Sequence, residues 1–288
     1  MQLRLHLSNR QPLNLSVVPA KAGTLFQVPP VNRTEIPVPG GKDTVVVGPM
    51  PNNSDHPLNV DGQPRAFFGR RSGKRLHSGQ QALYEDLLPK LTLRLPQEGP
   101  LDVQAAFSGK GQKVLEIGYG GGEHLARQAR EHPDTGFVGC EVFTGGIAKV
   151  VQAIAEDDLQ NVKLFTDDAL KLLVALPDSC LDAVYLLYPD PWPKTRHHKR
   201  RFVSPTTLGE LARTVRPGGQ FNFATDIEDY ANWTLAHIVR EPRFRFAPEG
   251  PAGWHQPFAG WVPTRYEQKA RREGRPISFY FSFDRCPA

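Results

Sequence analysis

The alternation of short apolar runs with amphipathic helical stripes restricts the fold of this chain more than any other feature. Apolar runs of strand length occupy residues 113–117, 137–141, 162–166, 181–187 and 220–224. The segments between them have helical spacing; Ile147, Val150, Val151 and Ile154 follow the i, i+3, i+4, i+7 pattern. Alternating strands and helices predict a parallel sheet with right-handed crossovers and helices on both faces.

Local signals place several helix boundaries. Ser78 and Gln81 form a capping-box pattern for a helix that we expect Pro89 to end. Ser204 and Pro205 are predicted to be the N-cap and the first residue of a later helix.

The end of the chain departs from the alternation. Residues 216–219, Arg-Pro-Gly-Gly, are expected to turn into the strand at 220–224, and a helix is expected over 227–240. Residues 243–246 and the alternating run 277–283 then indicate two strands with no clear helix between them. This pair predicts one antiparallel strand added to the sheet.

Glycines cluster where the first strand meets the first helix, in the sequence Gly-Tyr-Gly-Gly-Gly at 118–122. In doubly wound sheets a ligand binds outside the carboxyl ends of the strands at such a point. Gly118 and Gly120 match a dinucleotide-binding loop, but Glu123 replaces its third glycine. A carboxylate at a helix N-terminus disfavours a phosphate, so the loop favours S-adenosylmethionine over a nicotinamide cofactor.

Acidic residues follow the next two strands. Glu141 comes about 20 residues after the loop, where a carboxylate can accept both ribose hydroxyls; an ordinary surface glutamate is the alternative. Asp168, followed by Ala169, can bind an adenine amino group or simply cap the next helix. Together these features predict an α/β, Rossmann-like class I methyltransferase fold, with a mostly parallel seven-stranded sheet, helices on both faces and an antiparallel C-terminal strand.

The loop after the fourth strand is the most informative stretch. Residues 188–201 read Tyr-Pro-Asp-Pro-Trp-Pro-Lys-Thr-Arg-His-His-Lys-Arg-Arg. Three prolines and a tryptophan stiffen the loop, so we expect Asp190 to be held beside the methyl group of a bound cofactor. An Asx turn that only stabilises the loop is the alternative for Asp190. The acid and the basic run after it indicate an anionic, purine-bearing substrate.

This run resembles the signature of the tRNA (guanine-N7)-methyltransferase family of bacterial type. The resemblance extends from residue 66 to the end and includes the basic run 70–75, Ala224-Thr225-Asp226 and the Thr-Arg-Tyr-Glu-Gln-Lys sequence at 264–269. Lys269-Ala270 departs from the Arg-Gly that some members carry at that place.

The resemblance implies methyl transfer from S-adenosylmethionine to N7 of a tRNA guanine, at position 46 of the variable loop, forming 7-methylguanosine. It implies that Asp190 is catalytic and also contacts the cofactor. The other cofactor-binding residues expected are Glu116, Gly118, Gly120, Glu141, Asp168 and Ala169. The substrate-binding residues expected are Lys194, His197, Arg200, Asp226, Thr264, Arg265, Tyr266 and Glu267.

Guanine N7 has an in-plane lone pair and no proton at neutral pH, so the reaction needs no strong base. It needs near-attack geometry, stabilisation of the charge that develops on guanine, and exclusion of water. We expect Asp190 to supply the electrostatic part. Glu267 is expected to accept hydrogen bonds from guanine N1–H and the N2 amine, which distinguish guanine from adenine.

Two other functions stay open: methylation of another RNA base, or RNA binding without catalysis on the same scaffold. The formal net charge of +5 allows a polyanionic partner. The basic runs at 70–75, 194–201 and 269–275 are expected to follow tRNA phosphates, although each could be a solvated loop. We expect a monomer or homodimer without an obligate partner subunit.

The composition favours a cytoplasmic protein without a metal. Three cysteines lack CxxC spacing, which argues against a disulfide framework and a structural zinc site. His197 and His198 have no further ligands at suitable spacing. No apolar stretch approaches the length of a membrane span, and the first ten residues contain no apolar leader.

Residues 1–65 are rich in Pro, Asn, Gly and Val and lack helical periodicity. We therefore expect a largely unstructured arm before a domain at 66–288. The only methionines are Met1 and Met50, so a start of translation at or near Met50 is a further hypothesis. An intact residue 1 in the mass spectrum of the native protein would overturn it.

Overall fold

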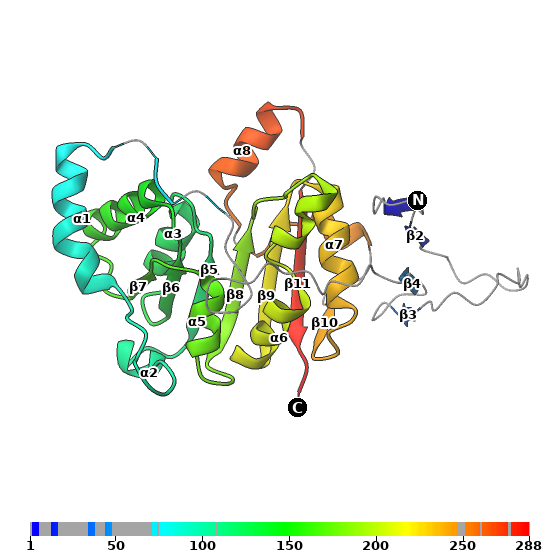
Figure 1. Cartoon of the computed structure of the whole chain (residues 1–288), viewed down its shortest axis with the longest axis horizontal. Helices are drawn as coiled ribbons and strands as arrows, with labels where there is room; N and C mark the ends of the chain where they lie inside the picture. Colours follow the sequence, from blue (N-terminus) through cyan, green and yellow to red (C-terminus); the bar gives the residue numbers. More distant parts are fainter. Residues whose placement is uncertain are drawn as a thin grey trace, which may run out of the picture.

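The structure is a computed structural model, shown in Figure 1, and it describes residues 2–5, 13–16, 34–37, 44–47, 69, 71–73, 75–107, 109–246, 251–259, 261–275 and 278–287. Its helices are α1 (Ser78–Leu91), α2 (Val103–Ala106), α3 (Glu123–Glu131), α4 (Thr144–Glu156), α5 (Ala169–Ala175), η1 (Thr195–Arg200), α6 (Pro205–Thr214), α7 (Glu228–Ile238), η2 (Pro251–His255) and α8 (Arg265–Arg272). Its strands are β1 (Gln2–Leu5), β2 (Leu13–Ser16), β3 (Thr34–Pro37), β4 (Thr44–Val47), β5 (Lys113–Ile117), β6 (Gly136–Cys140), β7 (Val162–Phe165), β8 (Leu181–Leu187), β9 (Val215–Thr225), β10 (Phe244–Phe246) and β11 (Phe279–Arg285).

Seven strands form one sheet in the order β10-β11-β9-β8-β5-β6-β7. The pairs from β7 through β9 are parallel, and β11 runs antiparallel to both of its neighbours. This confirms the predicted sheet with its antiparallel C-terminal strand. The chain moves outward from β5 through β6 to β7 and then returns to the other side of β5 as β8. The carboxyl ends of β5 and β8 therefore flank a topological switch point, where α/β proteins bind ligands.

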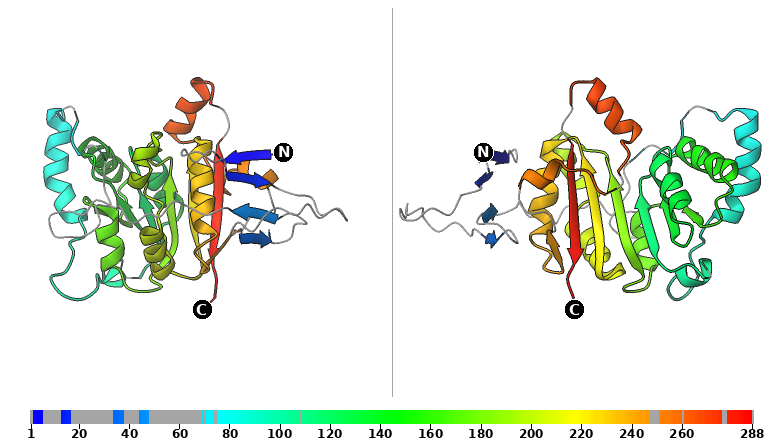
Figure 2. Two further views of the ribbon diagram at one scale, coloured as in Figure 1. Left: turned by 45° about the vertical axis from the view of Figure 1, so that its right-hand side comes forward. Right: turned by 180° about the vertical axis from the view of Figure 1, so that it is seen from behind.

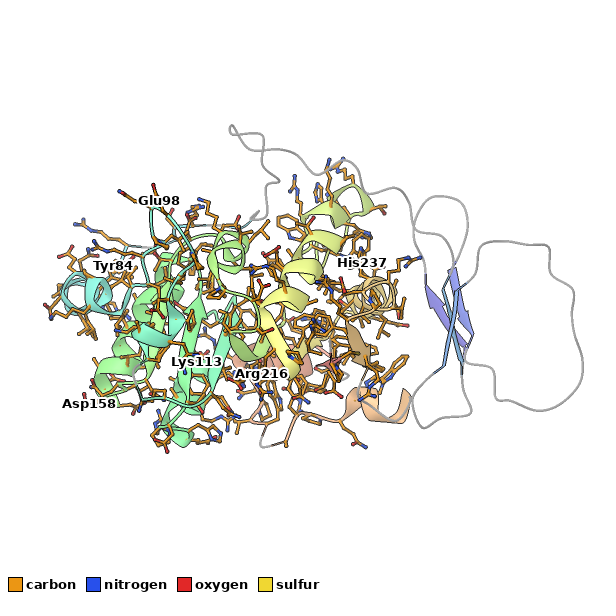
Figure 3. The ribbon with its side chains drawn as sticks, turned by 90° about the horizontal axis from the view of Figure 1, so that it is seen from below. Tyr84, Glu98, Lys113, Asp158, Arg216 and His237 are labelled. Atoms are coloured by element: carbon orange, nitrogen blue, oxygen red, sulfur yellow. The ribbon has the colours of Figure 1, made fainter. Side chains whose placement is uncertain are left out.

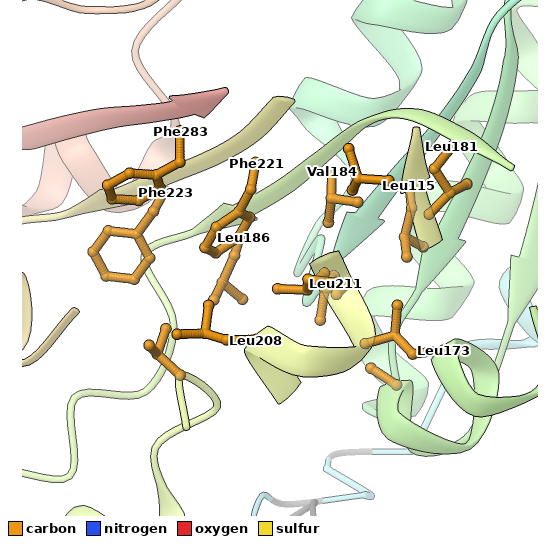
Figure 4. Packing of buried hydrophobic residues seen from close by; sticks show 14 of the residues in the cluster. Leu115, Leu173, Leu181, Val184, Leu186, Leu208, Leu211, Phe221, Phe223 and Phe283 are labelled. Atoms are coloured by element: carbon orange, nitrogen blue, oxygen red, sulfur yellow. The ribbon is translucent and has the colours of Figure 1, made fainter. Parts of the chain in front are cut away.

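Apolar side chains alternate between the two faces of the sheet, as the period of a strand requires. In β5, Leu115 and Ile117 join the core shared with α2, α5, α6 and α7, whereas Val114 joins the core shared with α1, α3 and α4. Figure 4 shows Leu173 of α5 and Leu211 of α6 packed toward the strands in the first core. Helices thus cover both faces of the sheet, as the two views in Figure 2 show.

One carboxylate links three strands at the end of the sheet opposite the switch point. Asp182 accepts hydrogen bonds from the backbone N–H of Lys113 at 2.6 Å and from the Arg216 guanidinium at 2.6 Å. Lys113 and Arg216, both labelled in Figure 3, begin β5 and lie near the start of β9. Asp182 therefore ties β8 to its two neighbouring strands.

Helix α1 differs from its predicted boundaries. Its N-cap is His77, without a side-chain cap, and it continues through Pro89 to Leu91. Pro89 lies close enough to the end that only one intrahelical bond is lost, and Thr92 N–H still donates to the Leu88 carbonyl at 2.9 Å. Leu91 is buried in the core with α4, which favours continuation of the helix.

Two further expectations need correction. Strand β9 begins at Val215 rather than at residue 220, but residues 216–219 form an irregular stretch between its pairs Val215–Leu181 and Gln220–Ala183 with β8, where Gly218 has a φ of +76°. A helix, α8, lies between β10 and β11, where none was expected. Only Glu267 and Ala270 of α8 are buried, so the helix has too few apolar residues to produce a periodic signal.

Two antiparallel ribbons, β1–β2 and β3–β4, lie within residues 1–65, and the sequence did not predict them. The rest of that segment lies outside the described residues, so the extent of the arm and the domain boundary at 66 remain predictions. Across the part of the chain that the structure describes, no helix combines the length and apolarity needed to span a bilayer.

Candidate functional site

A pocket of about 380 Å³ opens at the carboxyl ends of β5, β6, β7 and β8. It brings together most of the residues predicted to bind a cofactor and some of those predicted to bind a substrate. These lining residues are Glu116, Gly118, Gly120, Glu141, Asp168, Ala169, Asp190, Arg200, Thr264 and Tyr266. Lys194, His197, Asp226, Arg265 and Glu267 do not line it.

The glycine loop between β5 and α3 depends on glycine for two physical reasons. Gly118, Gly120 and Gly122 have φ of +70°, +57° and +77°, a region that favours glycine. Gly146 of α4 passes so close that a Cβ there would lie 2.2 Å from the Gly120 carbonyl oxygen. The close approach of α4 therefore fixes the backbone of the loop at one wall of the pocket.

Glu141 follows β6 and is held by the loop backbone. One carboxylate oxygen accepts the N–H of Gly120 at 3.0 Å, and the other accepts those of Val142 at 2.8 Å and Phe143 at 3.0 Å. These bonds use three of the roughly four acceptor positions of a carboxylate. The remaining position can accept a hydrogen bond from one ligand hydroxyl without rearrangement. Glu141 could accept from a second hydroxyl only by releasing one of the backbone N–H groups.

Asp168 is the N-cap of α5, because its carboxylate accepts the Leu170 N–H at 2.9 Å. The capping role that the sequence left as an alternative is therefore present. Asp168 also lines the pocket, with the buried Ala169 beside it. The capping role therefore does not exclude the contact with adenine, which stays a prediction.

The segment before α1 closes one side of the pocket. Thr144 donates from its backbone N–H and its hydroxyl to the Arg71 carbonyl, both at 3.0 Å. The Arg71 guanidinium donates to Asp167 at 3.0 Å. Arg71 was predicted to follow tRNA phosphates, but here it anchors its own segment to the pocket rim, where Gly69 lines the pocket.

The loop that bears Asp190 is held in an unusual backbone conformation. Tyr188 and Trp192, on either side of Asp190, have φ of +50° and +44°. Such non-glycine residues persist only where the surroundings hold them, and they concentrate at functional sites. Tyr188 N–H donates to the Ala224 carbonyl at 2.7 Å, and its hydroxyl lies 3.1 Å from the Ser278 hydroxyl. The loop is thus attached to the adjoining strand β9.

Asp190 is exposed and lines the pocket. Its predicted place beside the methyl group of a bound cofactor stays a prediction. Its carboxyl group faces solvent on one side, but the pocket wall removes part of its hydration, and this desolvation raises the pKa of Asp190. None of the ion pairs found among the described residues involves Asp190. Its negative charge is therefore available to a cation in the pocket.

Sequence reasoning missed a buried pair beneath the glycine loop. Glu116 and His124 are 3% and 8% exposed, and His124 Nδ1 lies 2.8 Å from a Glu116 carboxylate oxygen. The centre of the His124 ring lies 5.1 Å from that of the Tyr185 ring and 5.4 Å from that of the Trp261 ring. No sequence signal marks His124, because a histidine on the inner side of a helix has no distinctive spacing.

Helix α8 lies over the glycine loop, on the upper side of the molecule in Figure 1. A Cβ on Gly120 would lie 3.3 Å from the Tyr266 ring, and Arg265 pairs with Glu123 at 3.5 Å. Thr264 caps the helix by accepting the N–H of Glu267 at 3.2 Å. Helix α8 therefore forms the roof of the pocket near the glycine loop.

Glu267 and Asp226 already have partners in this arrangement. Glu267 is 1% exposed, and its two carboxylate oxygens accept hydrogen bonds from Trp261 and Arg271. Asp226 accepts a hydrogen bond from Arg275 at 2.8 Å. Neither carboxylate faces the pocket, so both roles in guanine binding remain predictions.

The basic run after Asp190 forms the short helix η1. Lys194 is exposed, and the Arg200 guanidinium lies 4.9 Å from the centre of the Trp192 ring. Desolvation and the charges of its basic neighbours lower the pKa of His197. No group of three or more potential metal ligands occurs within the described ranges.

Comparison with known proteins bears on the family of this chain. Residues 110–280 match the sequence model of a family described as "Putative methyltransferase". The tRNA (guanine-N(7)-)-methyltransferase of Brucella anthropi is 48% identical over 225 residues, covering 78% of this chain and 95% of that protein. That of Rhizobium meliloti is 50% identical over 222 residues, covering 77% and 95%.

Among solved structures, the 16S rRNA methyltransferase KamB superposes with a TM-score of 0.48 at 21% identity, covering 66% of this chain and 96% of that one. The family match over more than half of the chain and the identity to nearly complete relatives are decisive. This chain belongs to the tRNA (guanine-N(7)-)-methyltransferase family.

Proposed function

We propose that the protein transfers a methyl group from S-adenosylmethionine to N7 of a guanine in tRNA, forming 7-methylguanosine. The observation that carries this proposal is the position of Asp190. A strained loop holds Asp190 in the lining of the pocket, to which the glycine loop and Arg200 of the basic helix η1 also contribute. Family membership supports tRNA as the substrate and guanine N7 as the acceptor.

The pocket fits S-adenosylmethionine in size and in chemistry. Its volume of about 380 Å³ lies within the usual range for small-molecule sites. Glu141 retains an acceptor position for a ribose hydroxyl, and Phe143 and Ala169 supply apolar wall for an adenine ring. Glu123 in the first turn of α3 disfavours a phosphate at the loop, which argues against a dinucleotide.

Basic residues lie close in the sequence to residues that line this pocket. Arg200 lines it directly, Gly69 precedes the run at 70–75, and Tyr266 lies shortly before the run at 269–275. Positive charge around the mouth of a pocket attracts a polyanion and orients it there. We include in the proposal a cytoplasmic enzyme that acts as a monomer or homodimer without an obligate partner subunit.

The residues of the chain orient the reactants, exclude water and stabilise charge. S-adenosylmethionine, when bound, supplies an electrophilic methyl group. The glycine loop, Glu141 and Asp168 orient that group, and α8 with Tyr266 covers the loop and excludes water. As the N7–carbon bond forms, the sulfur–methyl bond would break and the electron pair would leave with sulfur as a neutral thioether. Asp190 stabilises the positive charge that develops on the guanine, because a preorganised charge needs little reorganisation.

Guanine recognition by Glu267 requires a change in the position of its carboxylate. Its carboxylate is oriented by Trp261 and Arg271 but does not line the pocket, so contact with guanine N1–H requires a shift of α8. Methylation at position 46 of the variable loop rests on the family resemblance.

The test is incubation of the full-length protein with labelled S-adenosylmethionine and unmodified tRNA, followed by nucleoside digestion and mass spectrometry. We expect the label in 7-methylguanosine. Label in another nucleoside would show a different RNA base methyltransferase. Cofactor binding without any labelled nucleoside would support an RNA-binding protein without catalysis.

A further inference from the structure

The last residue of the basic run, Arg201, differs from its neighbours. The sequence groups it with Lys194, Arg196, Lys199 and Arg200 as a phosphate contact. Its side chain, however, has no solvent-exposed surface, while Lys194 and Arg196 are exposed. A guanidinium buried in this way cannot reach a phosphate, so Arg201 has another role.

The contacts of Arg201 join the Asp190 loop to helix α7. Its Nε donates to the Pro191 carbonyl at 2.8 Å, one residue beyond Asp190. Its Nη2 donates to the Asp229 carboxylate, and its Nη1 donates to the Asp229 carbonyl oxygen at 3.4 Å. The planar, permanently charged guanidinium suits both partners at once, which a lysine ammonium does not.

Aromatic rings fix the plane of the same guanidinium. Its central carbon lies 4.9 Å from the centre of the Tyr230 ring and 5.2 Å from that of Trp233. Cation–π contacts of this kind are strongest where water is excluded. Both rings belong to α7 and are largely buried, so Arg201 is attached to the rigid core of the molecule.

The loop needs such an attachment. Tyr188 and Trp192 hold positive φ on either side of Asp190, and a strained loop keeps this shape only while its surroundings hold it. Tyr188 is bonded to β9 through Ala224, at the start of the loop. The bond from Arg201 to Pro191 restrains its other half.

We propose that Arg201, held by Asp229, is a positioning residue that fixes the Pro189–Trp192 backbone and thereby places the Asp190 carboxylate at the reacting methyl group. Arg201 itself touches neither cofactor nor tRNA. The inference rests on the proposed methyl transfer to tRNA, so the wild-type enzyme must first form 7-methylguanosine in the same assay.

The principal test compares Arg201→Lys with a matched control, Arg213→Lys, in the full chain. Arg213 also pairs with two carboxylates, Glu210 and Asp178, and donates to backbone carbonyls, but it lies at the opposite end of β8. We expect Arg201→Lys to lower kcat by about 10- to 100-fold, because a misplacement of about 1 Å can cost that much. The KM values for tRNA and S-adenosylmethionine should change by less than about threefold.

The control should keep kcat within about twofold, even if its Tm falls as far as that of Arg201→Lys. An unchanged kcat in Arg201→Lys would overturn the inference, and so would an equal loss of kcat in both variants. A wild-type protein that forms no 7-methylguanosine would instead overturn the proposed function.

A rescue experiment separates positioning from folding. Arg201→Ala leaves a space beside Asp229 and Pro191 that methylguanidinium can fill. We expect millimolar methylguanidinium to raise the kcat of Arg201→Ala by at least about fivefold, while methylammonium, which lacks the planar fork, does not. Hydrogen exchange should be faster at Asp190 and Trp192 in the unrescued variant. If methylguanidinium has no effect on a folded variant, the inference is wrong.

Discussion

Two aspartates near the pocket have opposite electrostatic surroundings. Asp167 is partly desolvated, but hydrogen bonds from Lys171 and Arg71 outweigh this and lower the pKa of its carboxyl group. At Asp190 burial removes hydration and no neighbouring cation offsets the loss, so the pKa of its carboxyl group is raised. Asp167 therefore serves to anchor the rim segment, whereas Asp190 has an uncompensated charge that can act on a ligand.

Replacement of Asp190 by Asn should separate activity from stability. We expect kcat to fall by about 100- to 1,000-fold, the range found when one preorganised electrostatic group is removed. The Tm should stay unchanged or rise. A raised pKa means that the ionised carboxylate is less favourable in the folded state than in the unfolded state, and this penalty grows as the pH rises. Turnover near the wild-type rate would refute the role of Asp190.

The pH profile gives a second check on the same carboxylate. If Asp190 acts in its ionised form, kcat/KM should fall as the pH is lowered through the raised pKa of Asp190 in the free enzyme, above the usual value of 3.8. Any residual kcat/KM of Asp190→Asn should lack this acidic limb. The same limb in both enzymes would assign it to another group.

The pair formed by Glu116 and His124 makes a stability prediction. His124→Ala leaves the Glu116 carboxylate buried without its hydrogen-bond partner, so we expect a loss of about 1–3 kcal/mol in the free energy of unfolding. Urea denaturation measures this loss. His124→Gln, which retains a donor, is the control and should lose less. A His124→Ala variant as stable as the wild type would show that Glu116 finds another partner.

At the scale of the elements, the packing of α4 against the glycine loop shapes the cofactor pocket. Gly146 leaves no space for a side chain, because the Gly120 carbonyl lies against it, and Glu141 lies close on the same side. The helix and the loop thus form one wall, and neither can move without the other.

Gly146→Ala should therefore weaken cofactor binding. The added methyl group must push α4 from the loop, so we expect a loss of about 1–3 kcal/mol in stability and weaker binding of S-adenosylmethionine by calorimetry. Gly79→Ala is the control, since a Cβ there meets nothing within 4 Å in helix α1. That variant should gain up to about 1 kcal/mol. Equal cofactor affinity in both variants would contradict the prediction.

At the scale of the whole molecule, the described residues that form the seven-stranded sheet, the two large hydrophobic cores and the pocket all come after residue 65. The lining of the pocket begins at Gly69, and the two cores begin at Leu83 and Leu93. The three basic runs also lie after residue 65.

Deletion of residues 1–65 should therefore leave an active enzyme. We expect Tm within a few degrees of the full chain and kcat within about twofold, measured on the same tRNA. Deletion of residues 1–77 is the informative comparison, because it also removes Arg71 and its bonds to Thr144 and Asp167. That variant should bind S-adenosylmethionine more weakly. Loss of activity in the shorter deletion would place part of the functional domain within the first 65 residues.

The sequence by itself predicted the elements whose signals are local. The strands at β5 and β8 have the predicted ends, and Ser204 caps α6 as expected, because strand periodicity and capping depend on neighbouring residues. Helix α8 was not predicted, because it has a capping residue but only two buried residues and therefore no apolar stripe. Pro89 was misinterpreted because burial of Leu91 outweighs a local preference.

For the site, the sequence determined which chemical groups are available, and the fold brought Glu116, Glu141, Asp168 and Asp190 to one pocket as predicted. Only the tertiary structure showed that Arg201 is buried against α7 while Lys194 and Arg196 of the same run are exposed. It also showed that His124 pairs with Glu116 and that Glu267 is turned toward Trp261 and Arg271. Residue type and spacing fix what a side chain can do. Its partners come from elements distant in the sequence, and they decide which of those possibilities it serves.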